Sequence, residues 1–374
     1  MQYTEYELGE LLPFEQPTAY IVKSTDYCDA YATPVLTAGK SFILGKTNET
    51  DGIFDQLPVI IFDDFTTATQ FVNFRFKVKS SAMKILHINT DLVIPKYIFY
   101  RLQIIQFDHS THKRYWIQSY SKIKVLIPPL DEQFRIVARI EELFSELDKA
   151  VDTLKTTKEQ LEVYRQAVLK DAFSDFEKKD SIRNLTMVVT SGSRGWAKYY
   201  SNSGALFVRI GNLTHSGIDI DFRDIQHITP PDNAEGVRTR LQPNDVLVSI
   251  TADLGSIGFV SEKVEEAYIN QHIALVRFQN PVQGRFMAWY LRSEYGQKDL
   301  LKNKRGGGKL GLGLDDIRDT PVPIVSDLVA QKTVDEIEER LSVCDSIEKT
   351  VDATLAQADA MRQSILKQSF EGKI

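Results

Sequence analysis

Lysine and arginine side chains gather in short glycine- or serine-bearing segments of this sequence, at 36–50, 77–84 and 109–116 and again at 190–198, 208–215 and 302–309. Lysine, arginine and backbone amides can hold phosphates, and arginine and asparagine can form paired hydrogen bonds to guanine and adenine. For any one of these residues a solvated surface charge is the alternative, but the clustering favours a nucleic-acid contact. The residues predicted to bind DNA are Lys40, Lys46, Asn48, Lys79, Lys84, Lys113, Arg114, Arg194, Lys198, Arg209, Asn212, Lys304, Arg305 and Lys309.

Catalytic motifs do not accompany these segments. The stretch AGKSFILGKT looks like a phosphate-binding loop, but the leading glycine of GxxxxGK[ST] would fall on Lys40 or Pro34. His109 and His112 have the spacing of a metal-binding pair on a helix, yet the segment looks like a loop, in which that spacing does not bring the two rings together. The chain also lacks an Asn-Pro-Pro-aromatic motif, a GxSxG elbow and an HExxH motif. We therefore predict no catalytic residue and no metal site.

Charge and composition bound the class of protein. The net charge is -6, and the acidic excess lies in 131–180 and 327–374, so that the remainder is mildly basic and permits DNA binding. The two cysteines, Cys28 and Cys344, are far apart in the sequence and belong to no CxxC or Cys/His motif, which favours neither a disulfide framework nor a zinc site. No apolar run is long enough to span a membrane, and MQYTEYELGE is acidic and polar, without the basic start and apolar core of a secretory leader, so we expect no leader here. We expect a cytoplasmic protein of two domains without a membrane partner.

One phrase occurs twice and marks the elements that must position these segments. Residues 165–173 read RQAVLKDAF and residues 362–370 read RQSILKQSF. Each phrase ends a stretch without proline or glycine, 131–175 and 327–371, with apolar residues at alternating spacings of three and four, as in a coiled coil. The alternative is that each helix packs only on its own domain. The predicted seam is Ile140, Phe144, Leu147, Val151, Leu154, Leu161, Val168, Ile337, Leu341, Cys344, Val351, Leu355 and Ile365.

The chain order predicts an α+β protein with an internal repeat. Strands are expected at 58–63, 73–79, 205–210, 245–250, 256–260 and 272–278, and shorter helices at 95–103 and 284–304. The expected segments are a globular domain at 1–128, a long helix at 129–178, a second globular domain at 179–324 and a second long helix at 325–374. If the second helix returns along the first, the two form an antiparallel coiled coil with approximate two-fold symmetry, and the two domains lie at its opposite ends.

The whole chain resembles the specificity subunit of type I restriction-modification systems, the HsdS family. The order of domain, helix, domain, helix carries the resemblance, as do PPLDEQFRIVARIEELFSELD at the start of the first helix and the repeated helix ends RQAVLKDAF and RQSILKQSFEGKI. The segments TPVLTAGKSFILGKTNETDGIF and PVIIFDDFTTATQFVNFRFKVKSSAMKIL resemble one class of that family's target recognition domains. The second helix departs from the pattern, because VSDLVAQKTVDEIEERL lacks the glutamate before its glutamine.

The resemblance implies a non-catalytic subunit. Each recognition domain would read one half of an asymmetric bipartite site in double-stranded DNA, and the helices would set the unspecified spacer between the halves. Two modification subunits that bring S-adenosylmethionine would dock on the helices, and restriction subunits with ATP and Mg²⁺ would join them. The alternatives are a single-chain restriction or methyltransferase enzyme and a coiled-coil adaptor that binds only proteins.

Overall fold

The protein consists of two compact units, each of which contains one globular domain and parts of two long helices. The computed structural model describes residues 3–38, 41–108, 114–302, 304 and 311–374. Unit 1 comprises Met1–Leu154 with Ala353–Ile374, and unit 2 comprises Lys155–Asp352. Because these units run across both long helices, the segment boundaries expected after residues 128, 178 and 324 stay predictions.

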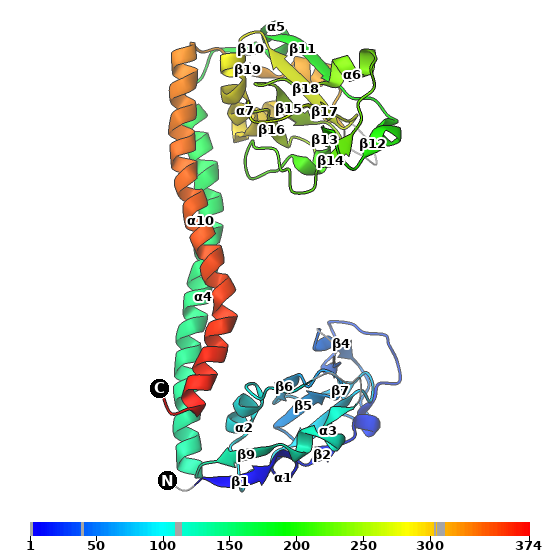
Figure 1. The fold of residues 1–374 in the computed structure, drawn as a ribbon, viewed down its shortest axis with the longest axis vertical. Coiled ribbons are helices and arrows are strands. Elements are labelled where there is room, and N and C mark those ends of the chain that lie inside the picture. Colours follow the sequence, from blue (N-terminus) through cyan, green and yellow to red (C-terminus); the bar gives the residue numbers. More distant parts are fainter. Residues whose placement is uncertain (1–2, 39–40, 109–113, 303, 305–310) are drawn as a thin grey trace. The chain divides into compact units, whose positions relative to one another are not determined.

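The domain of unit 1 is a layered arrangement of two sheets and short helices (Figure 1). The larger sheet has the order β2 (Phe14–Glu15), β8 (Met83–His87), β5 (Val59–Asp63), β6 (Thr69–Val72), and the smaller has the order β4 (Ile43–Thr47), β3 (Thr33–Leu36), β7 (Lys77–Val78). A separate ribbon pairs β1 (Thr4–Glu7) with β9 (Lys124–Ile127). The helices are α1 (Leu8–Leu11), η1 (Pro17–Tyr20), α2 (Pro95–Leu102), α3 (Tyr115–Gln118) and η2 (Tyr120–Lys122).

Alternation along β5 divides the apolar core of unit 1 in two. Ile60 and Phe62 belong to the cluster that includes residues of α2 and the start of the first long helix. Val59 and Ile61 point the other way and pack with Leu36 and Val78 of the smaller sheet. Successive side chains of a strand point to opposite faces, so a strand with four consecutive apolar residues, Val59 to Phe62, must be covered on both sides.

Unit 2 repeats this plan with additional elements. Its larger sheet has the order β11 (Thr186–Ser191), β18 (Ile273–Phe278), β15 (Val246–Ser249), β16 (Ile257–Phe259). Its second sheet has the order β12 (Tyr200–Ser201), β14 (Gln226–Ile228), β13 (Ala205–Val208), β17 (Ala267–Ile269), and β10 (Lys179–Ser181) pairs with β19 (Pro321–Pro323). The helices are α5 (Ile182–Leu185), η3 (Trp196–Tyr199), η4 (Ile210–Asn212), α6 (Ala234–Thr239), η5 (Pro281–Gln283), α7 (Gly284–Arg292), α8 (Glu294–Leu300) and α9 (Leu314–Arg318).

Strand directions show that the two domains share one topology. The larger sheet is antiparallel throughout in both units. The smaller sheet contains one parallel pair in each, β3 with β7 and β13 with β17. The α+β class expected from the sequence is confirmed, and the repeat found in the helices extends to domains whose sequences show little likeness.

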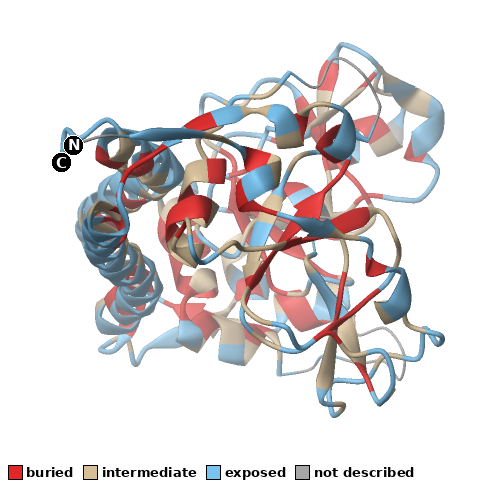
Figure 2. Ribbon diagram, turned by 90° about the horizontal axis from the view of Figure 1, so that it is seen from below, coloured by how far each residue is buried: buried red, intermediate tan, exposed pale blue. Residues whose placement is uncertain are grey.

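The long helices are α4 (Leu130–Phe173) and α10 (Asp327–Phe370), close to the ranges expected from the heptad spacing. Their pairing is antiparallel in unit 2, because Lys158 bonds Asp352 whereas Asp171, further along α4, bonds Arg340, nearer the start of α10. In unit 1, Asp148 of α4 bonds Arg362 near the end of α10. Most of the surface of both helices is exposed, whereas buried residues gather in the strands (Figure 2). The two helices fit the predicted antiparallel coiled coil.

All the predicted seam residues are buried or half-buried. Near the helix ends they also join the domain cores: Ile140 packs in the core of unit 1, and Val168, Ile337 and Leu341 pack in the core of unit 2. The helices therefore contact both each other and their domains, so that the two packing modes considered from the sequence coexist.

Several local predictions need correction. The strand expected at 73–79 is reduced to Lys77–Val78, and the segment 36–50, read as a loop, contains strand β4. The single helix expected at 284–304 is broken at Ser293, whose side chain accepts the Gly296 N–H at 3.3 Å and caps α8. Serine favours such a cap because its hydroxyl replaces a backbone acceptor that the first turn lacks.

Candidate nucleic-acid interface

In unit 1 the predicted DNA contacts fall mainly on the smaller sheet. Lys46 lies in β4 opposite Pro34, and Asn48 follows β4 and is exposed. Lys79 follows β7, is exposed, and its N–H bonds the Leu36 carbonyl at 2.9 Å. Arg114 is exposed just before α3. Asn48 follows the end of β4 and Lys79 follows the end of β7, and these two strand ends lie at opposite ends of the smaller sheet. The sheet therefore presents a polar side chain at each of its two ends.

Lys84 is a correction, because it cannot reach a ligand. Its side chain is 1% exposed, and its Nζ lies 3.2 Å from Asp64, which also accepts the Trp116 N–H at 2.8 Å. Lys77 in the same segment is similarly buried, with Nζ 3.1 Å from Glu49 and 2.5 Å from the Asp51 carbonyl. A buried lysine requires a carboxylate partner, and both pairs brace loops of the domain.

In unit 2, Arg194 and Lys198 are exposed on either side of a firmly anchored aromatic residue. Trp196 is buried in a cluster with Phe207 and Tyr268 on the second sheet. Its Nε1–H donates to Glu235 at 3.3 Å, and Glu235 also accepts the Ser193 N–H at 2.9 Å. The anchored turn therefore holds two cations at the surface of the sheet.

Asn212 is a second correction. Although we predicted a base contact, its side chain is buried and its polar atoms are engaged within the protein. Its Oδ1 accepts the Arg209 N–H at 2.8 Å, and its Nδ2 donates to the Asp221 and Asp224 carbonyls at 2.8 and 3.1 Å. Asn212 thus ties the turn at 209–212 to the turn at 221–224.

Between these two turns lies a surface hollow of about 630 Å³, which Arg209 and Arg223 line together with Asn270. The Arg209 Nη2 lies 3.7 Å from the exposed Asp224 carboxylate. Arg223, which is 90% exposed, pairs with Asp221. Hydrogen bonds from Arg223 hold the pKa of Asp221 at about 2. Arg223 was not among the predicted contacts, because the aspartates around it cancel the local charge in the sequence. The Asp-x-Arg spacing of residues 221–223 is the signal that could have identified it.

The remaining predicted contacts divide between exposed and undescribed residues. Lys304 is exposed. Lys40, Lys113, Arg305 and Lys309 lie outside the described residues, as do His109 and His112. Within the described ranges no group of three or more His, Cys, Asp or Glu side chains could hold a metal ion. No helix in those ranges is long and apolar enough to cross a membrane.

One constellation in unit 2 has the residue types of a hydrolytic triad but not its geometry. Asp253 Oδ1 lies 2.7 Å from His215 Nε2, and Ser256 Oγ lies 3.1 Å from the same nitrogen. In a triad the carboxylate and the hydroxyl contact different nitrogens, so that the ring can relay a proton between them. Ser256 also donates to Asp253 Oδ2 at 3.1 Å, which makes this cluster a loop brace.

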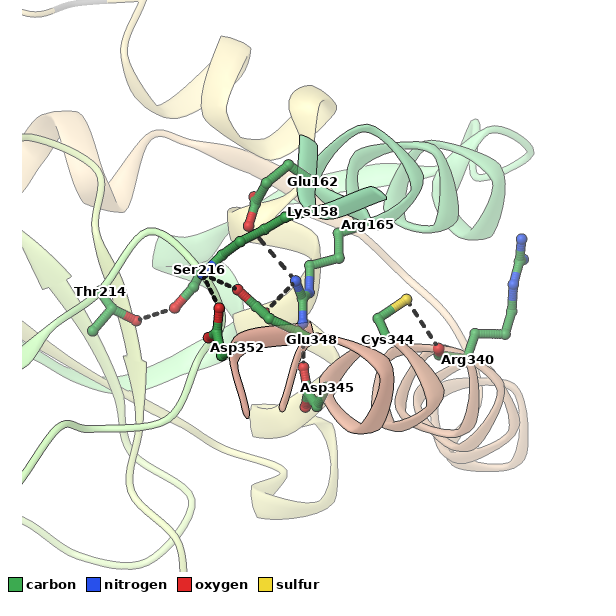
Figure 3. Close-up of polar contacts among 10 residues, drawn as sticks. All are labelled: Lys158, Glu162, Arg165, Thr214, Ser216, Arg340, Cys344, Asp345, Glu348 and Asp352. Carbon is green, nitrogen blue, oxygen red and sulfur yellow. Dashed lines mark hydrogen bonds and ion pairs between the residues drawn. The ribbon is translucent and has the colours of Figure 1, made fainter. Parts of the chain in front are cut away.

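The paired helices carry a charged cluster at their contact in unit 2 (Figure 3). The Arg165 side chain is 8% exposed and bonds Asp345 and Glu348 of α10, the latter at 3.0 Å. Lys158 extends the cluster to Asp352 at 2.8 Å and to Glu348 at 3.5 Å. Arg165 is one of the polar breaks in the heptad seam, and here it is satisfied by the facing helix.

Each unit also exposes apolar side chains where its long helix begins. In unit 1 these are Leu126, Leu130 and Phe134, with Phe134 63% exposed. In unit 2 they are Ile324, Leu328 and Val329, with Leu328 81% exposed. We call these groups the unit 1 and unit 2 apolar patches. Contiguous exposed apolar groups mark protein-binding surfaces, and in each unit these residues are close together in sequence, at matching places of the repeat.

Comparisons with known proteins agree with this architecture. The chain is 45% identical over 174 residues to the type I restriction enzyme EcoR124I/EcoR124II specificity subunit of Escherichia coli, a match that covers 43% of each chain. It is 24% identical over 281 residues to the EcoBI specificity subunit of Escherichia coli, covering 66% of this chain and 58% of that one. The chain thus spans about half the length of these curated relatives. No protein-family model matches it.

Two solved structures share the fold. One chain, from a study of complex assembly and conformational transition of the type I R-M system, aligns with a TM-score of 0.72 at 16% identity, over 100% of this chain and 98% of that one. The HsdS subunit from Thermoanaerobacter tengcongensis aligns with a TM-score of 0.58 at 15% identity, over 100% and 97%. The resemblance that the sequence motifs predicted is confirmed.

Proposed function

We propose, from this confirmed resemblance to specificity subunits of type I restriction enzymes, that the chain is the DNA-recognition subunit of a type I restriction-modification complex. Each globular domain reads one half of an asymmetric bipartite site in double-stranded DNA. The observation that carries the proposal is the repeated plan: two domains of one topology, each packed against its own part of α4 and α10, present different polar residues. Such a molecule suits two unlike half sites at a set separation.

The charge distribution supports a division of labour between domains and helices. Exposed cations such as Lys79, Arg114, Arg194 and Lys198 lie on the domains. Acidic residues predominate on the long helices, where arginines and lysines are partly neutralised by ion pairs between α4 and α10. DNA binding through phosphates must weaken as salt rises, because the release of counterions from DNA into a more concentrated salt solution gains less free energy.

Modification subunits dock, in this proposal, at the apolar patches where the long helices begin. The two patches occupy matching places, Leu126 and Leu130 in unit 1 and Ile324 and Leu328 in unit 2, which suits two copies of one partner. Methyl transfer from S-adenosylmethionine and ATP-dependent cleavage with Mg²⁺ then belong to the modification and restriction subunits. The chain acts in the cytoplasm, where its DNA partner is found.

Exchange of residues 1–128 for the corresponding domain of another specificity subunit tests the proposal. Sequencing of methylated adenines in cells that contain the partner subunits should show one altered half site and one unchanged half site. A change in both halves, or in neither, would contradict modular reading.

A further inference from the structure

The hollow between the turns at 209–212 and 221–224 places one exposed arginine in a fixed orientation. The Arg223 Nε lies 3.0 Å from each carboxylate oxygen of Asp221, and its Nη2 lies 2.5 Å from Oδ2. The Arg223 N–H also donates to Asp221 Oδ1 at 3.0 Å. A carboxylate that accepts hydrogen bonds from both Nε and Nη2 fixes the position and the plane of the guanidinium.

The supporting carboxylate is itself held in place. The Asp221 N–H bonds the Asn212 carbonyl at 2.8 Å, and the Asp221 carbonyl accepts from Asn212 Nδ2. Asn212 is buried in η4, which follows β13, so the turn that carries Arg223 is tied to the segment at the end of this inner strand of the second sheet. Most surface arginines lose conformational entropy when they bind a ligand. Arg223 loses less, because its pair with Asp221 already restricts its side chain.

The unused edge of Arg223 matches guanine. A guanidinium carries five N–H groups, and Asp221 takes one from Nε and one from Nη2. Among the described residues none bonds Nη1, so one N–H of Nη1 and the second N–H of Nη2 form a free pair of donors at the far end of the guanidinium. Two parallel donors on one arginine are the complement of guanine O6 and N7 in the major groove.

Charge favours a base over a phosphate at this position. Arg223 is neutralised by Asp221, and the fully exposed Asp224 carboxylate lies nearby, 3.7 Å from Arg209. Two carboxylates against two guanidinium groups leave the hollow without net positive charge, and a phosphate would face both carboxylates. A guanine edge is uncharged and offers only acceptors, so it meets the free donors without that repulsion.

We propose that Arg223, oriented by Asp221, reads a guanine in the half site recognised by unit 2, and that Asn212 is a positioning residue for this contact. The inference rests on the proposed function and adds a specificity-determining residue to it. Arg223 thereby replaces Asn212 as the base-contacting residue expected at this hollow.

The test uses the chain assembled with its modification subunits and a DNA library in which each position of both half sites is varied in turn. For Arg223→Ala we expect the preference for guanine over other bases to fall about 5- to 150-fold at one position of one half site, with the other half unchanged. Arg223→Lys should lower the same preference, because an ammonium lacks the two parallel donors that a guanidinium holds in one plane. Lys198→Ala removes another predicted DNA contact, and it should instead weaken binding to all sequences alike, because a lysine that holds a phosphate carries no base preference.

A second measurement keeps the wild-type chain intact. Replacing the guanine at that position by 7-deazaguanine removes the N7 acceptor, so it should weaken binding by the wild-type complex and leave binding by the Arg223→Ala complex unchanged. A uniform loss across all positions in Arg223→Ala, or unchanged preferences, would overturn the inference. Absence of any sequence preference in the wild-type complex would instead contradict the proposed function itself.

Discussion

Arg165 of α4 is hydrogen-bonded to Asp345 of α10, and the repeat of the chain reproduces this pair with the helices exchanged. Arg362 of α10, which corresponds to Arg165, bonds Asp148 of α4, which corresponds to Asp345. The repeated arginine-glutamine phrase and the repeated aspartate therefore serve one purpose, an ion pair between antiparallel helices in each unit. The two pairs differ in burial, because the Arg165 side chain is 8% exposed and the Arg362 side chain 36%.

Arg165→Met should destabilise the helix pair of unit 2. Removal of the guanidinium leaves Asp345 and Glu348 facing the seam without a cation, but both carboxylates can regain water, so we expect a loss of about 1–2 kcal/mol. Urea unfolding followed by circular dichroism measures the change. Arg139→Met is the control, because its pair with Glu142 is exposed and within one helix, and it should change the free energy by less than about 0.5 kcal/mol. Equal changes in the free energy of unfolding for the two substitutions would show that the ion pair between the helices stabilises the protein no more than an exposed pair within one helix.

Phe134→Asp should impair docking of one modification subunit without harming the fold. The side chain is 63% exposed at the start of α4, so its loss exposes no core. An aromatic residue at the centre of an interface contributes about 2 kcal/mol or more, which corresponds to a roughly 30-fold weaker affinity. Titration with the modification subunit in an analytical ultracentrifuge gives the stoichiometry and affinity. Val163→Asp, on an exposed position further along the same helix, should leave both unchanged; equal losses in the two variants would place the docking surface elsewhere.

Gly296→Ala should destabilise unit 2 strongly. A Cβ at this position would lie 2.1 Å from the Tyr290 carbonyl oxygen, because α8 begins directly against the end of α7. Since backbone must move to make room, we expect a loss of about 2–3 kcal/mol, seen as a lower midpoint of thermal unfolding. Gly211→Ala is the matched control, since nothing lies within 4 Å of its added Cβ. If both variants unfold at the wild-type temperature, the start of α8 does not lie as close to the end of α7 as described above.

Asp221 should titrate at about pH 2 in the folded chain, below its ordinary value of 3.8, because the side chain and N–H of Arg223 donate hydrogen bonds to the ionised form. A lowered pKa means that the pair stabilises the fold at pH values above 3.8 and that this stabilisation is lost as the pH falls towards 2. Carbon-detected NMR of the aspartate carboxyl groups measures the midpoint. In Arg223→Ala the midpoint should rise towards 3.8, and an identical midpoint in both chains would show that Arg223 does not hold Asp221.

The long helices could be predicted from sequence because their signal is long. The seam from Ile140 to Val168 repeats over many turns, and no proline or glycine interrupts it. Strands such as β17 and β12 contain only Ala267–Ile269 and Tyr200–Ser201, which is too short for an alternating pattern to appear. Their existence depends on pairing with distant strands, β13 and β14, that the local sequence does not specify.

The candidate interface was harder to predict than the fold, because the role of a charged side chain depends on its distant partners. Lys84 and Lys79 belong to one short segment, yet Lys84 is buried in an ion pair with Asp64, whereas Lys79 is exposed. Gln133 illustrates the same limit at the helix start: it bonds Ile94 and Leu92 of the domain, at 2.8 and 3.0 Å. Its counterpart Gln331 bonds along α10, to Asp335 at 2.8 Å, and Gln283 of the domain reaches the helix start instead, donating to Asp327 at 3.0 Å.

The proposal that the helices set the spacer between two half sites can be tested by their length. Insertion of seven residues into both α4 and α10, at facing positions, keeps the heptad phase and lengthens each helix by about 10 Å. Sequencing of methylated adenines should then show both half sites unchanged and the spacer longer by about three base pairs. A stable variant that methylates sites with the original spacer would contradict the account.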